Sequence, residues 1–488
     1  MRKSNLLGGA ILFAALFVNT SCKEIFGNMD LNGGSTVSSY LSISTSTLNL
    51  DPGESAQRVA TSISPATISY ESENPAVATV DQQGNVTAVA LGETRIKVSV
   101  PASGNYDAGT VYYPVAVKYF TPLTLEAIED GKVTIMINGV TLEQPIQYAI
   151  DGGSKQSTKA TTSIDVKAGQ KVQFYSTNSY ITKGENGESK SSYTTILADD
   201  TQCYVYGNVM SMVTPDGKYE DNKEFTAPYA LAYLFYKPSG KSNKIMNHPT
   251  KPLVLQATTL SEGCYASMFN GCSSLESAPE LPNVEELTNY CYMGMFKSCK
   301  KLTSAPKLPA TKLSKQCYRQ MFQSCEALAV APELPAEDIN ENCYQEMFNG
   351  CKVLKKAPTL PATTLYKQCY ANMFKNCEAL EEVQAKLPAE TLVANCYNGM
   401  FNGCKSLEKA PELPATNMKI TAVYRDMFNG CTKLNYVKCL ATSINTNNSN
   451  NWLNGVAATG TFVKAKGADW GDRSVKGIPE GWTVEEVE

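Results

Sequence analysis

Short alternations of apolar and polar residues fill the first part of the chain, from Leu41 to Val117. Apolar residues recur at every second position in runs such as Leu48-Asn-Leu50, and turn formers such as those at 51–53 (Asp-Pro-Gly) separate the runs. A period of two places alternate side chains on opposite faces of a strand, and no helical spacing competes with it. The pattern predicts a small β-sandwich.

The segment 119–250 continues the strand pattern with other turns. Lys132–Ile137 and Val140–Leu142 flank Asn138-Gly139, the dipeptide that best suits a type I′ turn, so we predict a hairpin there. Further strands are expected at 163–166, 171–174 and 203–206, which together predict a second β-sandwich. Near its end, Leu234-Phe235 and 253–260 already echo the pattern that follows, and this predicts a degenerate capping rung.

A long repeat occupies residues 251–442, where Met-Phe pairs recur with a period of 26 or 27 residues. The unit reads Leu-Pro-Ala-Thr-x-Leu-x-x-x-Cys-Tyr-x-x-Met-Phe-x-Gly-Cys-x-x-Leu-x-x-Ala-Pro. One unit cannot bury its own apolar stripe, so seven units are expected to stack as the rungs of a solenoid. The methionines that mark rungs 1 to 7 are Met268, Met295, Met321, Met347, Met373, Met400 and Met427.

Within a rung, the apolar residues also fit a helical wheel. Cys264, Met268 and Cys272 fall on one side, which predicts an inward-facing helix of about two turns that ends at a left-handed Gly271. The segment 275–281 would be a strand, kept short by a proline in most rungs. The expected fold class is mainly β with short helices: a β-sandwich, a second β domain and a repeat solenoid.

The N-terminus has the pattern of an export signal. Arg2 and Lys3 precede an apolar run from Leu6 to Val18 that is too short to span a bilayer. A cysteine directly after such a segment resembles the lipidation site of a bacterial lipoprotein, which implies that Cys22 becomes an acylated N-terminus and anchors the protein to the outer membrane. Secretion after ordinary cleavage is the alternative.

Two parts of the chain resemble known families. The segment 68–98, which contains Asn74-Pro75, Gly84, Gly92 and the valines of Val-Ala-Thr-Val and Val-Thr-Ala-Val, resembles the bacterial immunoglobulin-like domain of group 2. The repeat unit resembles the leucine-rich repeats of BspA-like bacterial surface proteins. With the charged start and polar tether after Cys22, the chain resembles surface lipoproteins of the Bacteroidetes. These resemblances imply a stalk domain and a repeat region that binds host proteins or other cells.

Composition narrows the function. There are 43 Lys and Arg against 47 Asp and Glu, a net charge of −4, so no basic field is present to hold nucleic acid. His248 is the only histidine, which removes Ser-His-Asp triads and HExxH zinc sites; it is expected to be a surface or capping residue. No phosphate loop or metal-ligand spacing occurs, so we predict neither an enzyme nor a cofactor.

Cysteine pairs recur in six rungs as Cys-x7-Cys, from Cys264 and Cys272 to Cys396 and Cys404. Export to an oxidising compartment favours disulfides, whereas a helix between the pair would hold the two Cα atoms about 12 Å apart, beyond bridging distance. In rung 7, Val423 replaces the first cysteine while Cys431 remains, which suits small core residues. Buried thiol ladders are therefore favoured over bridges.

Aromatic residues supply the candidate ligand contacts. A tyrosine ladder could be an exposed strip for sugars or a packing layer, and its position beside the apolar face favours packing. Trp452 and Trp470, after the last rung, could cap the solenoid or stack on glycans, and capping is favoured. The candidate contacts are Tyr265, Tyr292, Tyr318, Tyr344, Tyr370, Tyr397, Trp452 and Trp470.

These observations favour a surface adhesin or interaction protein whose partner is a host extracellular protein or a cell-surface glycan. The alternative is a glycan-binding accessory lipoprotein of a nutrient-uptake system. The predicted segments are a signal peptide (1–21), a tether (22–35), a bacterial Ig-like domain (36–118), a β-rich domain with the solenoid cap (119–250), leucine-rich repeats (251–442) and a C-terminal cap (443–488).

Overall fold

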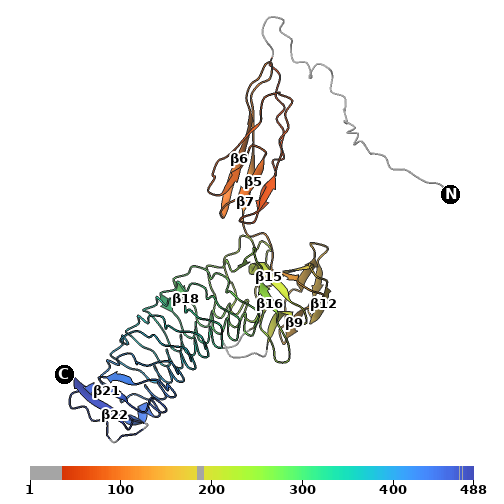
Figure 1. The fold of residues 1–488 in the computed structure, drawn as a ribbon. Coiled ribbons are helices and arrows are strands. Elements are labelled where there is room, and N and C mark those ends of the chain that lie inside the picture. The colour runs from red at the N-terminus through yellow and green to blue at the C-terminus, as the bar shows by residue number, and fades with distance from the viewer. Residues whose placement is uncertain (1–35, 184–191, 472, 475, 488) are drawn as a thin grey trace, which may run out of the picture. The chain divides into compact units, whose positions relative to one another are not determined.

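The structure is a computed structural model that describes residues 36–183, 192–471, 473–474 and 476–487. The chain divides into two compact units, Met1–Lys118 and Tyr119–Glu488 (Figure 1). Each unit has its own hydrophobic core. The fold is mainly β, and the only helices among the described residues are two short 3₁₀ helices, η1 (Val209–Met212) and η2 (Thr446–Ser449).

The N-terminal unit is the predicted β-sandwich. One sheet has the strand order β1-β7-β6-β3 and the other the order β2-β5-β4, and only β1 and β7 pair in parallel. Ile96, Val98 and Tyr113 are fully buried between the sheets, whereas Val89, one of the valines that carry the family resemblance, is 52% exposed. The strands are β1 (Leu48–Leu50), β2 (Ser55–Gln57), β3 (Ser69–Ser72), β4 (Ala78–Val80), β5 (Asn85–Ala88), β6 (Gly92–Val100) and β7 (Gly109–Val117).

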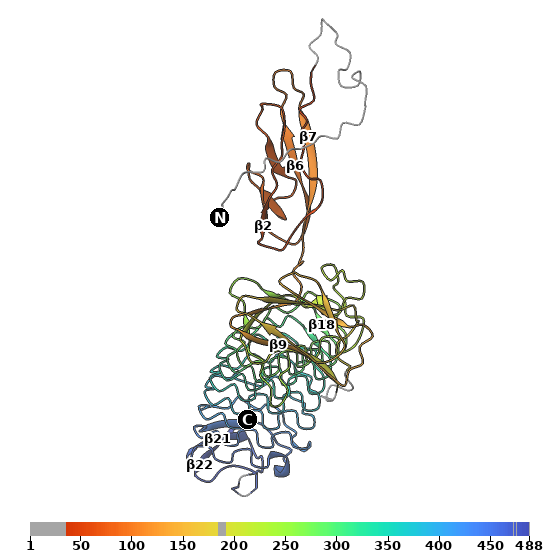
Figure 2. The same cartoon turned by 90° about the vertical axis from the view of Figure 1, so that its right-hand side faces the viewer.

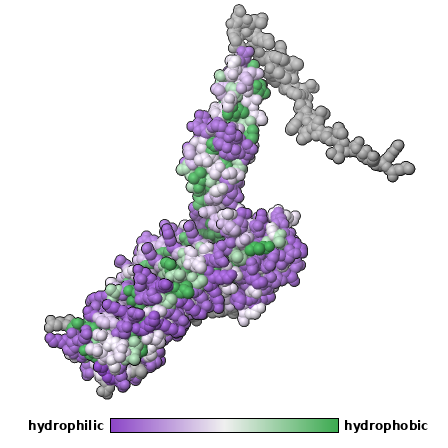
Figure 3. Space-filling view, in the orientation of Figure 1, coloured by the Kyte–Doolittle hydropathy of each residue, from purple (hydrophilic) through white to green (hydrophobic). Residues whose placement is uncertain are grey.

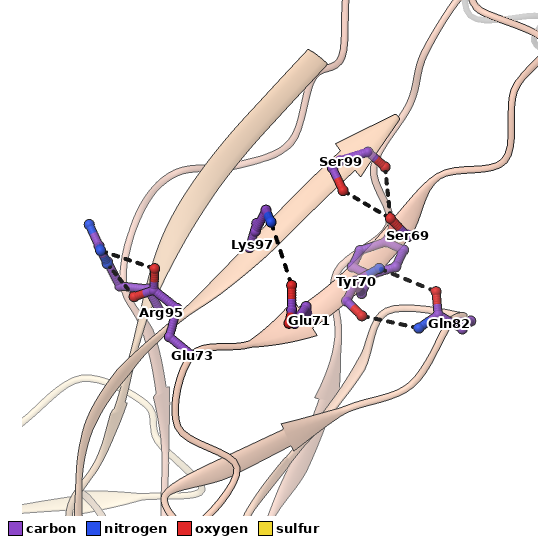
Figure 4. Close-up of polar contacts among 8 residues, drawn as sticks. All are labelled: Ser69, Tyr70, Glu71, Glu73, Gln82, Arg95, Lys97 and Ser99. Atoms are coloured by element: carbon purple, nitrogen blue, oxygen red, sulfur yellow. Dashed lines mark hydrogen bonds and ion pairs between the residues drawn. The ribbon is translucent and has the colours of Figure 1, made fainter. Parts of the chain in front are cut away.

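Polar side chains pair across β3 and β6 on the side of the sheet that faces water (Figure 4). Such exposed pairs add little stability, but they support one register of the two strands. The expected tight turn at Gly84 is present, with φ +79°, and a Cβ there would collide with the carbonyl oxygen of Arg58. The paired side chains are Ser69 with Ser99, Glu71 with Lys97 and Glu73 with Arg95, with contact distances of 2.9, 3.6 and 2.8 Å.

The C-terminal unit begins with two packed sheets, as predicted. One has the order β11-β10-β13-β8-β15-β16, with β17 also on β15, and the other the order β12-β9-β14. The strands are β8 (Thr124–Ala127), β9 (Gly131–Asn138), β10 (Ile146–Ile150), β11 (Gln156–Thr158), β12 (Thr162–Val166), β13 (Lys171–Tyr175), β14 (Tyr193–Ala198), β15 (Cys203–Asn208), β16 (Ile245–Asn247) and β17 (Leu253–Val254).

The hairpin predicted at Asn138-Gly139 is wrong. β9 pairs with β12 and β14, which come later in the chain, and not with residues 140–142. Gly139 has a left-handed φ of +65°, but Asn138 does not, so the type I′ geometry is absent. Leu142 is buried in the core, and burying it against strands distant in sequence outweighs the local turn preference.

Each rung of the solenoid contains a segment of repeated turns, from five residues before its methionine to four after it, which we name the turn layer. In rung 3 the amides of Tyr318, Phe322 and Ser324 donate to carbonyls of rung 4, at 2.7 to 3.1 Å, while Met321 donates back to Tyr318 within its own rung at 3.2 Å. Along the turn layer, backbone amides therefore alternate between hydrogen bonds to the next rung and hydrogen bonds within their own rung. These bonds satisfy the backbone donors and acceptors without a helix.

The predicted two-turn helix is corrected by this geometry. Every fourth residue of the turn layer has a left-handed backbone: in rung 3, φ is +58° at Gln316, +58° at Gln320 and +61° at Ser324. A left-handed residue in each turn breaks the right-handed spiral that a helix needs. Gly271 is left-handed as expected, with φ +87°, although it ends a turn and not a helix.

Short, irregular strands lie on the other side of the rungs, as the prolines predict. The strand expected over 275–281 is reduced to a single bridge between Ser277 and Ser304. Figures 1 and 2 show the rungs stacked side by side from β16 toward the C-terminal end, where three parallel strands finish the stack. The remaining strands are β18 (Glu286–Leu287), β19 (Lys312–Leu313), β20 (Tyr436–Cys439), β21 (Gly460–Ala465) and β22 (Trp482–Val487).

Residues 231–235 continue the stack in front of rung 1. Leu231 and Phe235 donate their amides to Cys264 and Met268 of rung 1, at 2.9 and 2.8 Å, in the same pattern as between later rungs. β14 covers the other side, where Ile196 donates to the Leu234 carbonyl at 2.7 Å. One continuous core therefore runs from the two sheets through every rung to the C-terminal strands. Among the residues that the structure describes, no helix has the length and apolarity to cross a membrane.

Candidate interaction surface

The tyrosine ladder lies inside the solenoid. Consecutive rings stack with centroids 5.7 to 6.4 Å apart, and the side chains are 0 to 1% exposed. A ligand on the folded surface cannot touch them, so the structure corrects their assignment as candidate ligand contacts and favours the packing interpretation. The ladder consists of Tyr265, Tyr292, Tyr318, Tyr344, Tyr370, Tyr397 and Tyr424.

The tryptophans close the end of the stack. Trp452 stacks on Tyr424 at 6.0 Å and on Trp470 at 5.2 Å, and it donates its indole N–H to the Gly477 carbonyl at 2.7 Å. Trp452 is 0% and Trp470 4% exposed. They act as a cap over the last rung, and this corrects their assignment as candidate glycan contacts.

The fifteen cysteines within the described part of the chain are free and buried. The second cysteine of each rung donates its S–H to the phenylalanine carbonyl of the rung before it, as Cys325 does to Phe296 at 3.1 Å. Burial raises the pKa of Cys291 to about 12 and that of Cys325 well above its usual value, so the thiols stay protonated. Cys22, the predicted lipidation site, lies outside the described residues.

Charged side chains on the outside of the solenoid alternate in sign from rung to rung. Glu326 lies 3.0 Å from both Lys300 and Lys352, which lower the pKa of its carboxyl, and Lys405 lies 3.1 Å from Glu378 on the next two rungs. Stacking identical repeats in register would place like charges above one another, and the alternation replaces that repulsion with attraction. The hydrophilic colour of much of the repeat surface in Figure 3 agrees with this composition.

A second outer surface is formed by the turn layers of rungs 4 to 6. We define the amide face as the residues one and two before each methionine and two and three after it on these rungs: 345, 346, 349, 350, 371, 372, 375, 376, 398, 399, 402 and 403. Half of these positions carry Asn or Gln. Glu346 and Lys375 are the two charged residues, and no side chain of the face is an apolar one larger than alanine.

Two carboxamides of the amide face pack closely against glycines. A Cβ added at Gly399 would collide with Oδ1 of Asn372, and one added at Gly403 would come within 2.6 Å of Oδ1 of Asn376. These two asparagines therefore lie over the glycines of the next rung. Sequence reasoning missed this face, although its signal is visible in the sequence as polar or small residues at fixed offsets from each methionine.

Two open depressions lie elsewhere on the described surface. One of about 540 Å³ is lined by Lys419, Asn445, Asp469 and Trp470 at the C-terminal end, and one of about 510 Å³ lies beside Arg95 in the N-terminal unit. The described residues include no cluster of three or more His, Cys, Asp or Glu that could hold a metal ion.

His248 lies in a loop beside the seven-stranded sheet. Its ring packs edge-on against Tyr204 and Tyr206 at 5.2 and 5.0 Å, and Nδ1 accepts hydrogen bonds from the backbone amides of Thr250 and Lys251. Burial, with Lys251 nearby, lowers its pKa, so the ring is neutral at pH 7. These contacts give the histidine a structural role in shaping the loop.

The stacked rungs with buried ladders define a repeat solenoid, joined in one chain to an Ig-like sandwich. Residues 40–111 match the family of the bacterial Ig-like domain (group 2), and residues 315–452 match six copies of the BspA type leucine-rich repeat region. Both resemblances inferred from the sequence are confirmed. Domains of these families are typically non-catalytic, and BspA-type repeat proteins are often surface-associated. No curated protein matches the chain.

Proposed function

We propose that this chain is a surface-exposed, non-enzymatic adhesin or interaction protein that presents its solenoid to macromolecules outside the cell. The observation that carries this proposal is that each rung combines a constant buried core with a variable outer surface. The residues that define the repeat, such as Tyr344, Met347 and Cys351, are 0 to 1% exposed, while the outer positions differ from rung to rung. A broad surface of stacked rungs suits a macromolecule better than a small substrate.

The partner we propose is a host extracellular protein or a cell-surface glycan. Lys–Glu alternation leaves little net charge along the rungs, which argues against nucleic acid. The apolar side chains on the outside are scattered, with Val330 73% and Val353 44% exposed on rungs 3 and 4. Such residues can anchor a protein partner, because protein interfaces bury apolar centres within polar rims.

Anchoring belongs to the same proposal. We propose that residues 1–21 are removed, that Cys22 is acylated, and that the protein is held at the outer membrane with the N-terminal unit as a stalk. That unit has a separate hydrophobic core, which supports a spacer role. A secreted protein without the lipid is the alternative.

Cell-surface labelling and adhesion test the proposal together. Protease applied to intact cells should degrade the protein, and Cys22→Ala should move it from the membrane to the soluble fraction. Cells that lack the protein should attach less to host matrix, and the complete chain should restore attachment. Deletion of 36–118 leaves the core of the second unit intact and should preserve binding by the purified protein. Undiminished attachment without the protein, or loss of binding on removing the stalk alone, would contradict the proposal.

The second candidate is a glycan-binding accessory lipoprotein of a nutrient-uptake system. The amide face favours it, because carboxamides both donate and accept hydrogen bonds and so match sugar hydroxyls. Growth on a polysaccharide as sole carbon source distinguishes the two: a growth defect without an adhesion defect supports the nutrient role.

A further inference from the structure

We propose that the amide face is a binding surface for a neutral glycan chain. This inference deepens the proposed function by assigning one ligand class to one surface. It starts from hydrogen-bonding capacity that the fold leaves unused. The side chains of Asn349, Asn372, Asn376 and Asn402 make no hydrogen bond to any described residue, and each offers an N–H₂ donor and a carbonyl acceptor.

Two of these asparagines, Asn372 and Asn376, occupy left-handed positions of the turn layer, with φ +54° and +59°, which favour asparagine, but neighbouring backbone groups need no hydrogen bond from their carboxamides. Asn372 and Asn376 donate their own amides to the carbonyls of Asn398 and Asn402 on the next rung, at 2.8 and 2.7 Å, and Gly403 donates to Asn429 at 2.7 Å. Asparagine in loops commonly serves to satisfy neighbouring backbone groups. Here that role is filled by the stacking of the rungs, so the carboxamides are left for a ligand.

The packing also orients the carboxamides before a ligand arrives. Asn372 and Asn376 lie over Gly399 and Gly403, where any larger residue would displace them. The glycines thus keep the amides close to the surface and restrict their rotation. A group held in its binding orientation loses less entropy on binding, which compensates for the modest energy of each hydrogen bond.

The chemistry of the face selects a neutral, hydroxyl-rich partner. Its charged residues, Glu346 and Lys375, are of opposite sign, and Glu346 already accepts the amides of Gln320 and Gln323 at 2.8 Å each. A polyanion or a basic peptide therefore finds no complementary field. A protein partner finds no aromatic or aliphatic anchor, whereas interface centres are enriched in such residues. Sugar hydroxyls both donate and accept, as the carboxamides do.

The repeat gives the surface a spacing along which a chain can extend. Each of rungs 4 to 6 carries asparagine on this face, at offsets from the methionine that vary from rung to rung, and the buried rings below are 5.6 to 5.9 Å apart. A polymer of similar units can therefore meet a carboxamide on each successive rung. Multiple weak contacts then add through effective concentration.

Affinity gel electrophoresis of the complete mature chain tests the inference, with dextran, starch or galactomannan in the gel and heparin as the charged comparison. The binding variant is the triple change Asn349→Ala, Asn372→Gly and Asn402→Ala, with glycine at 372 because that residue is left-handed. The matched control alters three exposed residues of the same rungs on another side, Lys355→Ala, Glu381→Ala and Glu408→Ala. Tryptophan fluorescence of all three proteins verifies that the capped solenoid is folded.

We expect at least one neutral polysaccharide to retard the wild-type protein, the binding variant to lose tenfold or more in affinity, and the control to bind normally. Retardation by heparin alone, by no polysaccharide, or equally in wild type and binding variant would overturn the inference, as would an equal loss in the control. Adhesion to host matrix by a protein that ignores every neutral polysaccharide would leave the proposed function standing while this inference fails.

Discussion

Gly294→Ala tests the backbone conformation of the turn layer. A helical and a left-handed backbone at this residue predict opposite changes in the free energy of unfolding. Gly294 lies between Cys291 and Cys299, in the middle of the segment where the apolar pattern fits a helix, and its φ is +60°. In a helix interior, replacing glycine by alanine stabilises by roughly 0.5–1 kcal/mol. In the left-handed conformation, alanine costs about 1–2 kcal/mol because its Cβ crowds the following carbonyl.

The surroundings of Gly294 allow the backbone effect to be isolated. A Cβ there would lie 3.1 Å from the hydroxyl of Ser267, which needs to shift by only a few tenths of an ångström, and 4.0 Å from Cβ of Lys297. Gly350→Ala is the calibration, since Gly350 has φ +80° and no neighbour closer than 3.5 Å, and it is left-handed in either architecture. The two variants should therefore lose similar amounts of unfolding free energy, about 1–2 kcal/mol each.

Urea unfolding supplies the measurement. Trp452, Trp470 and Trp482 all lie in the C-terminal cap, so tryptophan fluorescence follows the solenoid and not the N-terminal unit. Hydrogen exchange of peptides from rung 2 reports the local change near Gly294. A stabilised Gly294→Ala protein, with Gly350→Ala destabilised, would refute the left-handed turn layer and restore the helix. Gly399→Ala, which collides with Asn372, should cost more than either, and Asn372→Ala should relieve the excess.

Three further outcomes follow from the buried ladders. Burial raises the pKa of Cys291 and Cys343 from 9.0 to about 12. Their full contribution to the free energy of unfolding is present below pH 9, and above it this free energy falls by about 1.4 kcal/mol per thiol and pH unit, because the thiols ionise first in the unfolded chain. Urea unfolding midpoints at pH 8 and pH 10 measure the loss. Alkylating reagent should modify the cysteines only after denaturation, and a Cys264–Cys272 link in a non-reduced peptide map would contradict the free-thiol ladder. Tyr370→Phe should leave the free energy of unfolding unchanged or raise it, because the buried hydroxyl has no hydrogen-bond partner. Tyr370→Ala, which removes the ring, should lower it by about 3–5 kcal/mol. A loss above about 1 kcal/mol in the Phe variant would instead reveal a hydrogen bond made by the hydroxyl.

The sequence alone determined which side chains are inside. Cys264, Met268 and Cys272 are spaced four residues apart, and all are fully buried, as the apolar pattern predicts. The two-residue alternation likewise identified the N-terminal sandwich, and the 26- or 27-residue period identified the stack. Apolar residues must leave water in any conformation, so their periodicity is a reliable guide to the buried face.

The tertiary structure decided which backbone conformation places these side chains inside the solenoid. A helix of 3.6 residues per turn and a chain of four-residue turns place nearly the same residues inside over two turns, so the wheel could not distinguish them. What separates them is bonding along the stack, as from Tyr318 to Cys343, which exists only when neighbouring rungs are present. The hairpin at Asn138-Gly139 failed for the same reason, because β9 finds its partners in β12 and β14.

The amide face depends both on the sequence of each rung and on the way the rungs stack. Its asparagines can be read from the sequence within three residues of the methionines of rungs 4 to 6, but Asn372 and Gly399 are 27 residues apart and meet only because the rungs stack in register. Composition and periodicity specify what each rung contains. Register between rungs, which depends on backbone hydrogen bonds and packing across the stack, decides which of those residues become neighbours and so which surface a partner can meet.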